Sequence, residues 1–141
     1  MNSKTLVAAL LGGLASFFGG WLLYGLLLKG TMDSMTGTAT GVMKTDAEMM
    51  TAGNMITMFL GSLVMAYLLA YIFGKWATIS TAIGGAIAGA TIMGLIGLGY
   101  DLQMYASTNI FQLPMVFIDT ICSALLGALS GAVIAWWLGR K

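Results

Sequence analysis

Histidine is missing from this chain of 141 residues, and cysteine and proline each occur only once. Without histidine the chain lacks the commonest general base and the usual transition-metal ligand. It also lacks HExxH and CxxC patterns, phosphate-binding loops and any paired nucleophile and base. We therefore expect a protein that is not an enzyme, uses no cofactor and binds no metal.

Charge is scarce as well. Charged residues make up 8% of the chain and hydrophobic residues 59%, whereas an average soluble domain is about 25% charged. The formal net charge is +1 and there is no basic run, so nucleic acid is not an expected partner. The lone cysteine, Cys122, cannot form a disulfide within the chain and is expected to be a small buried apolar side chain. The composition indicates a single membrane domain over residues 1–141.

Four apolar runs predict four transmembrane helices, near residues 5–28, 50–74, 80–100 and 113–138. Each is long enough, at about 1.5 Å per residue, to cross a hydrocarbon core of roughly 30 Å. The first run is too long for the apolar region of a signal peptide, which has roughly 7–15 residues. The short connection at 75–80 predicts a tight antiparallel hairpin. The expected fold is an all-α, four-helix transmembrane bundle made of two antiparallel hairpins.

Residues 29–49 form the longest connection between the predicted spans, and Thr45 and Glu48 have the spacing of a capping box. A helix should therefore begin near Asp46. Methionines gather in or beside this loop, and since thioethers are soft ligands they leave copper(I) binding as an alternative; they are Met32, Met35, Met43, Met49 and Met50. Methionine is also an adaptable filler of apolar surfaces, which is the interpretation we favour without a histidine or a second cysteine nearby.

The basic residues indicate the orientation. Lys4, Lys75, Arg140 and Lys141 fall on one side of four alternating spans, whereas Lys29 and Lys44 fall on the other side among the acidic residues. The positive-inside rule then places both termini in the cytoplasm, in an inner membrane, and the loop at 29–49 outside.

Small residues recur at every fourth position along several spans, which allows helices to approach closely. The predicted packing positions are Gly12, Ser16, Gly20, Gly85, Gly89, Ser123, Gly127, Gly131 and Ala135. Because these positions exceed what four helices need for internal packing, we expect a noncatalytic protein that acts by helix packing. Its partners would be the lipid bilayer and either a second copy or another membrane protein, as a homo-oligomer or a subunit.

Asp119 is the one ionisable side chain inside the last apolar run. A carboxylate at the centre of a span costs about 2.5–3.5 kcal/mol, so Asp119 needs partners or a proton. The polar residues expected near it are Tyr24, Lys29, Asn54, Thr57 and Tyr100. One hypothesis is a single interhelical hydrogen bond that holds the bundle; the alternative is a site of a small transporter or channel for an ion, a proton or a small polar solute.

Two stretches resemble a family of small bacterial four-span proteins known only as a domain of unknown function. FFGGWLLYGLLLKG is similar to that family's Gly-x-x-Trp-Tyr-x-x-x-x-Phe-Gly-Lys pattern, and IFQLPMVFIDTICSALLGALSGAVIAWW is similar to its last helix. This chain departs from the pattern in that Trp21 and Tyr24 are not adjacent and no histidine follows Ile118 and Asp119. The resemblance implies four helices in a bacterial cytoplasmic membrane and implies no activity.

Overall fold

The computed structural model describes residues 3–42 and 44–140. Four helices in it are long and apolar enough to cross a membrane: Ser3–Leu27, Ala52–Ala77, Ala82–Ser107 and Leu113–Leu138. The first consists of α1 (Ser3–Gly20) and a π-helix, η1 (Trp21–Leu27); the second consists of α4 (Ala52–Tyr71) and a second π-helix, η2 (Ile72–Ala77). The third and fourth are α5 (Ala82–Ser107) and α6 (Leu113–Leu138). The structure confirms the expected all-α, four-helix fold.

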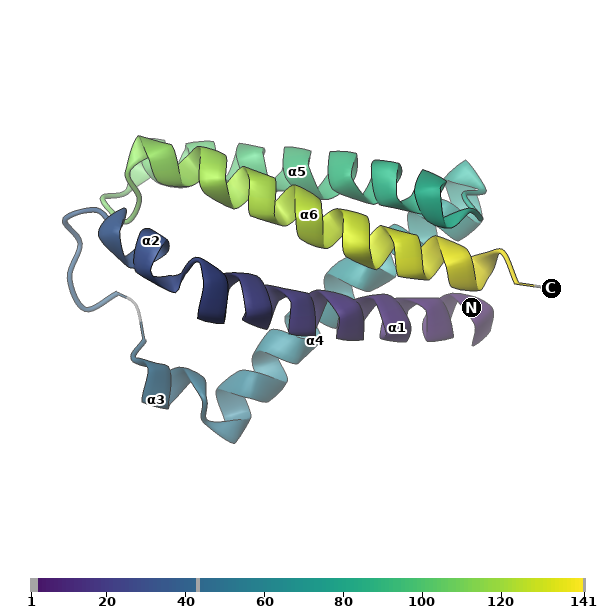
Figure 1. Cartoon of the computed structure of the whole chain (residues 1–141), viewed down its shortest axis with the longest axis horizontal. Helices are drawn as coiled ribbons and strands as arrows, with labels where there is room; N and C mark the ends of the chain where they lie inside the picture. Colours follow the sequence, from purple (N-terminus) through teal and green to yellow (C-terminus); the bar gives the residue numbers. More distant parts are fainter. Residues whose placement is uncertain (1–2, 43, 141) are drawn as a thin grey trace.

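The four helices form two antiparallel hairpins, α1 with α4 and α5 with α6, and α6 also packs along α1. The tight hairpin predicted across residues 75–80 is wrong, because α4 crosses obliquely and hardly contacts α5, the helix to which this connection joins it (Figure 1). Figure 1 shows α5 and α6 side by side along the long axis, while α4 crosses the other helices obliquely. Both termini lie at one end of the bundle, as four alternating spans require. We call this end the terminal end, and the opposite end, which carries residues 28–51 and 108–112, the loop end.

Glycine sets the spacing between α5 and α6. A Cβ added to Gly85 would meet the carbonyl of Gly131, and one added to Gly89 would meet the carbonyl of Gly127. A Cβ added to Gly131 or Gly127 would likewise meet the carbonyl of Gly85 or Gly89. Any side chain here would push the two backbones apart, so the close approach depends on these four glycines. Farther along, Gly97 faces the side chain of Ser123, and Ala135 lies against Gly85.

The contact between α1 and α6 is also built on small residues. Gly12 lies against Ile134 and Ser130, and the Ser130 hydroxyl donates a hydrogen bond of 3.1 Å to the Gly12 carbonyl. The Ser16 hydroxyl bonds to the carbonyl of Gly12 in its own helix, and Gly20 faces Leu126. The predicted small positions therefore lie largely at contacts within this one chain.

The apolar core lies in the terminal half of the bundle. Its buried members are Ala8, Ala9, Ala66, Leu69, Ala70, Phe73, Ile134 and Ala135. Toward the loop end α4 exposes Ile56, Leu60 and Val64, by 59%, 53% and 67%. Figure 1 shows that the end of α4 next to α3 (Asp46–Met49) is turned away from α5 and α6. The bundle is therefore closed at the terminal end and looser at the loop end.

The loop end has local structure of its own. Thr45 and Glu48 form the predicted capping box at the start of α3. The short helix α2 (Lys29–Ser34) follows η1, and the segment after it is joined to the connection before α6 by hydrogen bonds from Gly37 N to Ile110 O and from Gln112 N to Met35 O, of 2.7 and 3.2 Å. Backbone pairing between two distant connections ties the two hairpins together.

The end of the third span differs from its predicted position, and this difference affects the candidate site. The third span was expected over residues 80–100, but α5 continues through Asp101 to Ser107. The helix continues because Leu102, Met104 and Tyr105 prolong its apolar character. Asp101 is thereby placed inside a membrane-spanning helix.

Candidate functional site

Asp101 is the most buried charged residue described in the structure, with 3% of its surface exposed. One of its carboxyl oxygens, Oδ2, is buried and has no hydrogen-bond partner among the described residues. A buried polar atom of this kind is costly and calls for an explanation, such as a proton, a water molecule or an ion. Asp101 is therefore the starting point for a functional site.

The register of α5 against α6 brings Asp101 to Asp119. The two helices are antiparallel, with Gly89 against Gly127 and then Gly97 against Ser123 and Thr120. One helical turn beyond Gly97 on α5 is Asp101, and one turn before Ser123 on α6 is Asp119. The two carboxyl groups are within hydrogen-bonding reach of each other.

Tyr24 reaches the same place from η1. Its hydroxyl lies within hydrogen-bonding reach of the carboxyl of Asp119, the hydroxyl of Ser123 and the thiol of Cys122. Tyr24 is carried by a π-helical turn, a rare geometry that is frequent at functional sites because it changes which side chains face a neighbouring helix. We call Asp101, Asp119, Tyr24, Cys122 and Ser123 the carboxyl cluster.

The carboxyl cluster is shallow. Asp119 lies about 9 Å along α6 from its first residue, at a rise of about 1.5 Å per residue. Asp101 is likewise close to the end of α5 at Ser107. The cluster therefore sits in the part of the bundle near the loop end, within one or two helical turns of the helix termini.

A hydrogen bond between two carboxyl groups requires a proton on one of them, because a carboxylate has only acceptors. Two bare carboxylates in contact would repel strongly in a medium of low dielectric. The cluster can therefore take up or release a proton, and it can present negative charge to a cation.

Of the five residues expected near Asp119, the structure brings Tyr24 to it. Lys29 instead forms an ion pair with Asp46, and the hydrogen bond from its ammonium raises the pKa of Lys29. The amide of Asn54 donates to the carbonyl of Glu48 and accepts from Lys44. These two residues are drawn away because α3 and the start of α4 stand apart from α6.

The remaining two expected residues also point elsewhere. The hydroxyl of Thr57 bonds to the carbonyl of Gly53 in its own helix, on a part of α4 that is exposed. Tyr100 is 61% exposed and lies on a different face of α5 from its neighbour Asp101. Sequence reasoning missed Asp101, although matching the glycine pairs of the third and fourth spans in antiparallel register would have placed it opposite Asp119.

The methionines of the loop end do not add to this site. Met32 and Met35 are half-buried near α2, Met49 is half-buried in α3 and Met50 is exposed, while Met43 lies outside the described residues. Within 3–42 and 44–140, no group of three or more histidine, cysteine or acidic side chains is arranged to hold a metal ion. Copper(I) binding by the methionines stays a prediction.

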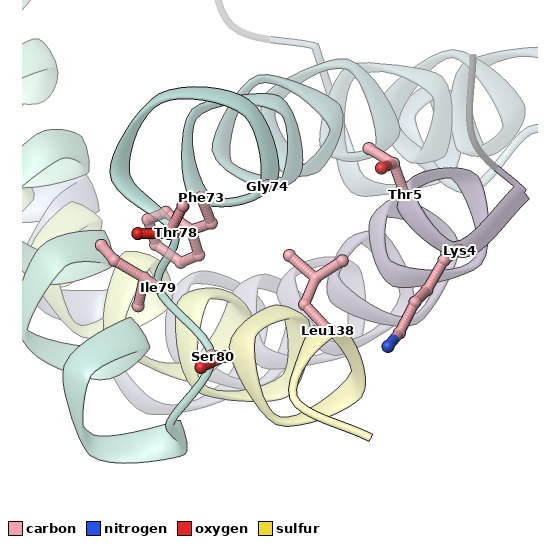
Figure 2. A pocket seen from close by; sticks show the side chains of 8 residues that line it. All are labelled: Lys4, Thr5, Phe73, Gly74, Thr78, Ile79, Ser80 and Leu138. Carbon is pink, nitrogen blue, oxygen red and sulfur yellow. The ribbon is translucent and has the colours of Figure 1, made fainter. Parts of the chain in front are cut away.

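A hollow of about 350 Å³ lies at the terminal end, far along the bundle from the carboxyl cluster (Figure 2). Its lining combines Lys4 and Thr5 of α1 with Phe73, Gly74, Thr78, Ile79, Ser80 and Leu138. The Lys4 ammonium donates to the carbonyl of Arg140, and the Thr78 hydroxyl donates to the carbonyl of Ala77. The first of these hydrogen bonds links the start of α1 to the residues after α6, so part of the polar lining serves the fold.

Comparisons with known proteins give no assignment for this site. No protein-family model, no curated protein and no solved structure matches this chain.

Proposed function

We propose that this small multipass membrane protein binds an ion at the carboxyl cluster and moves it across the membrane as a small transporter or channel. The observation that carries the proposal is the approach of Asp101 and Asp119 inside two apolar spans, with the Tyr24 hydroxyl within reach of the second carboxyl. Ionisable residues within spans are rare, and they commonly mark ion or proton pathways.

The alternative hypothesis for Asp119, a structural lock, is less consistent with the energetics. A hydrogen bond between membrane helices contributes about 0.6 kcal/mol on average. A charged aspartate at the centre of a span costs about 2.5–3.5 kcal/mol, which is an upper limit for each carboxyl of the shallower carboxyl cluster. Serine and threonine make interhelical bonds at lower cost, as Ser130 does with Gly12. Two carboxyl groups are therefore energetically costly as a contact between helices, whereas they are well suited to bind a proton or a cation.

Flux into liposomes tests this proposal. The full chain is reconstituted, and the flux of protons, alkali cations and small anions is followed under imposed gradients. We expect one of these ions to move in the wild type and Asp119→Asn to abolish its movement while the protein still folds. Asp33→Asn, which removes an exposed acid on α2, is the matched control and should leave flux unchanged. Wild-type protein without flux of any of these ions would refute the proposal.

A second candidate function is noncatalytic helix packing, in a homo-oligomer or as a subunit of a larger membrane complex. The observation that favours it is a face of α4 that carries small residues and that no other helix covers. Gly53 and Gly61 have nothing within 4 Å of an added Cβ, and Thr57 between them is exposed. The glycines at positions 85 and 89 of α5 already face those at 127 and 131 of α6, so the glycines of α4 offer an open face to another helix. Lipid tails are the competing occupant.

Gly61→Leu tests the second function. The added bulk should reduce self-association of the full chain in lipid nanodiscs, measured by the distance-dependent energy transfer between labelled copies. Gly99→Leu is the matched control, because Gly99 also has open space but lies on α5. An unchanged oligomeric state in both variants would place lipid on the α4 face. We propose a bacterial inner membrane with both termini in the cytoplasm as the location, on the strength of the basic residues at the terminal end.

A further inference from the structure

We infer that Asp101 and Asp119 bind one proton between them, so that the ion taken up by the carboxyl cluster is a proton rather than a metal cation. The inference rests on the proposed function in using the same site, and it names the ion. It goes beyond Asp119 alone because the second carboxyl, Asp101, is what makes the site specific for a proton.

The geometry of the pair favours a proton. The carboxyl groups approach each other directly, across helices that are held close by glycine. A bound Mg²⁺ or Ca²⁺ needs six or more oxygen ligands at about 2.0–2.6 Å, and it must lie between the carboxylates it binds. The two carboxyl groups and the hydroxyls of Tyr24 and Ser123 supply six oxygens at most, but the carboxyl groups lie within hydrogen-bonding reach of each other, which leaves no cation-sized gap between them.

The surroundings of each carboxyl indicate where the proton resides. The Tyr24 hydroxyl lies within hydrogen-bonding reach of Asp119, so it can donate to a carboxylate there and stabilise its negative charge. Asp101 is 97% buried and has one oxygen without a partner among the described residues. An unpaired oxygen costs much less on a neutral carboxyl group than on a carboxylate. In the observed arrangement Asp101 is therefore protonated and donates its O–H to Asp119.

Release of the proton breaks the O–H bond of Asp101, and the proton passes to water at the loop end. The pair then changes from one negative charge to two, and uptake reverses this step. The other ionisable groups that act on the pair are Tyr24 from η1 and Cys122 from α6. Lys29, the first cation after η1, is bound to Asp46 and does not neutralise the pair. Tyr24 is a positioning residue that stabilises the charge on Asp119.

Infrared difference spectroscopy of the reconstituted full chain, during a pH titration, tests the inference. A protonated carboxyl group has a C=O stretch distinct from that of a carboxylate. We expect one aspartic acid band that disappears as the pH rises, and labelling with ¹³C-aspartate should shift it. Asp101→Asn should remove the band, and Tyr24→Phe should move its midpoint without changing the number of protons released. Asp33→Asn is the control and should leave the band unchanged.

Each other outcome has a definite meaning. The absence of a protonated aspartic acid band from the wild type, or a band that survives Asp101→Asn, would overturn the inference. So would a band that sodium or potassium removes at constant pH, because a cation would then occupy the site. If Asp101→Asn does not fold, the wild-type isotope shift still decides whether an aspartic acid holds the proton. A titrating band without ion flux would support proton binding and refute transport. Ion flux without a protonated aspartic acid band would support transport and overturn the inference.

Discussion

Gly89 and Gly127 meet where α5 and α6 pack closely, and a Cβ on either residue would run into the backbone carbonyl of the other. This contact sets the register of the hairpin, and the register in turn places Asp101 opposite Asp119 several turns away. Packing and chemistry are therefore linked, because a change that separates the two helices at Gly89 also disturbs the carboxyl cluster.

Gly89→Ala should destabilise the protein for this reason. The added methyl group has no space, and forced overpacking typically costs about 1–3 kcal/mol. Gly99→Ala is the matched control in the same helix: it has open space and should be neutral or should stabilise by up to about 1 kcal/mol through helix propensity. Thermal unfolding in one detergent, followed by circular dichroism, compares the two. Equal melting temperatures would contradict the tight packing of α5 on α6.

Ser130→Ala should remove the bond between α6 and α1. Ser130 is 2% exposed, and its hydroxyl donates to the carbonyl of Gly12. We expect a loss of about 0.6 kcal/mol, and at most roughly 1.7 kcal/mol, from hydrogen bonds measured between membrane helices. Ser62→Ala is the control, because the Ser62 hydroxyl bonds only to its own helix at Met58. A loss as large in the control would mean that the bond to α1 adds no specific stability.

The capping box at α3 makes a prediction about pH. The backbone N–H of Thr45 and then its hydroxyl bond to Glu48 and lower the pKa of that carboxyl below its ordinary value. Since the pKa is lower in the folded loop than in the unfolded loop, this contribution to stability is present above the ordinary value and is lost as the pH falls through the folded value. Thr45→Ala should move the Glu48 pKa back toward its ordinary value, measured by ¹³C NMR titration. An unchanged pKa would show that the hydroxyl does not contribute.

Labelling with a membrane-impermeant maleimide tests the orientation. In a Cys122→Ser background, Thr40→Cys at the loop end should react on intact cells, whereas Ser80→Cys near the terminal end should react only after the membrane is opened. This result follows from the basic residues at the terminal end, which the positive-inside rule places in the cytoplasm. Reaction of both positions from outside, or the reverse pattern, would contradict the proposed orientation.

The sequence was sufficient to predict the four spans and the capping box, but not the pairing of Asp101 with Asp119. The four spans follow from long apolar runs, and the capping box at Thr45 follows from local spacing, so both are predictable and both are confirmed. Asp101 lay just beyond the range expected for the third span, so it was not expected inside the bundle. Its burial depends on Asp119, which is distant in sequence and adjacent only after α5 and α6 pair.

The residues that lie near Asp119 also depend on how the helices pack, which the sequence alone does not show. Asn54 and Thr57 were plausible because they occupy the loop half of a neighbouring span, but the oblique path of α4 carries that half away from α6. Lys29 is long enough to reach inward, yet Asp46 offers it an ion pair at the surface, where its charge stays hydrated. Tyr24 reaches the cluster because its long side chain extends from η1 to within hydrogen-bonding reach of Asp119.

Oxidative crosslinking tests the central claim, that the side chains at positions 101 and 119 face each other, most directly. The full chain carries Asp101→Cys and Asp119→Cys in a Cys122→Ser background, and crosslinked peptides are measured by mass spectrometry in lipid nanodiscs. The account predicts a disulfide within one chain, because facing positions on closely packed helices satisfy the short Cα separation that a disulfide requires. Tyr100→Cys with Asp119→Cys is the control pair, since Tyr100 is exposed. Crosslinking that is absent, or equal in the control pair, would contradict the account.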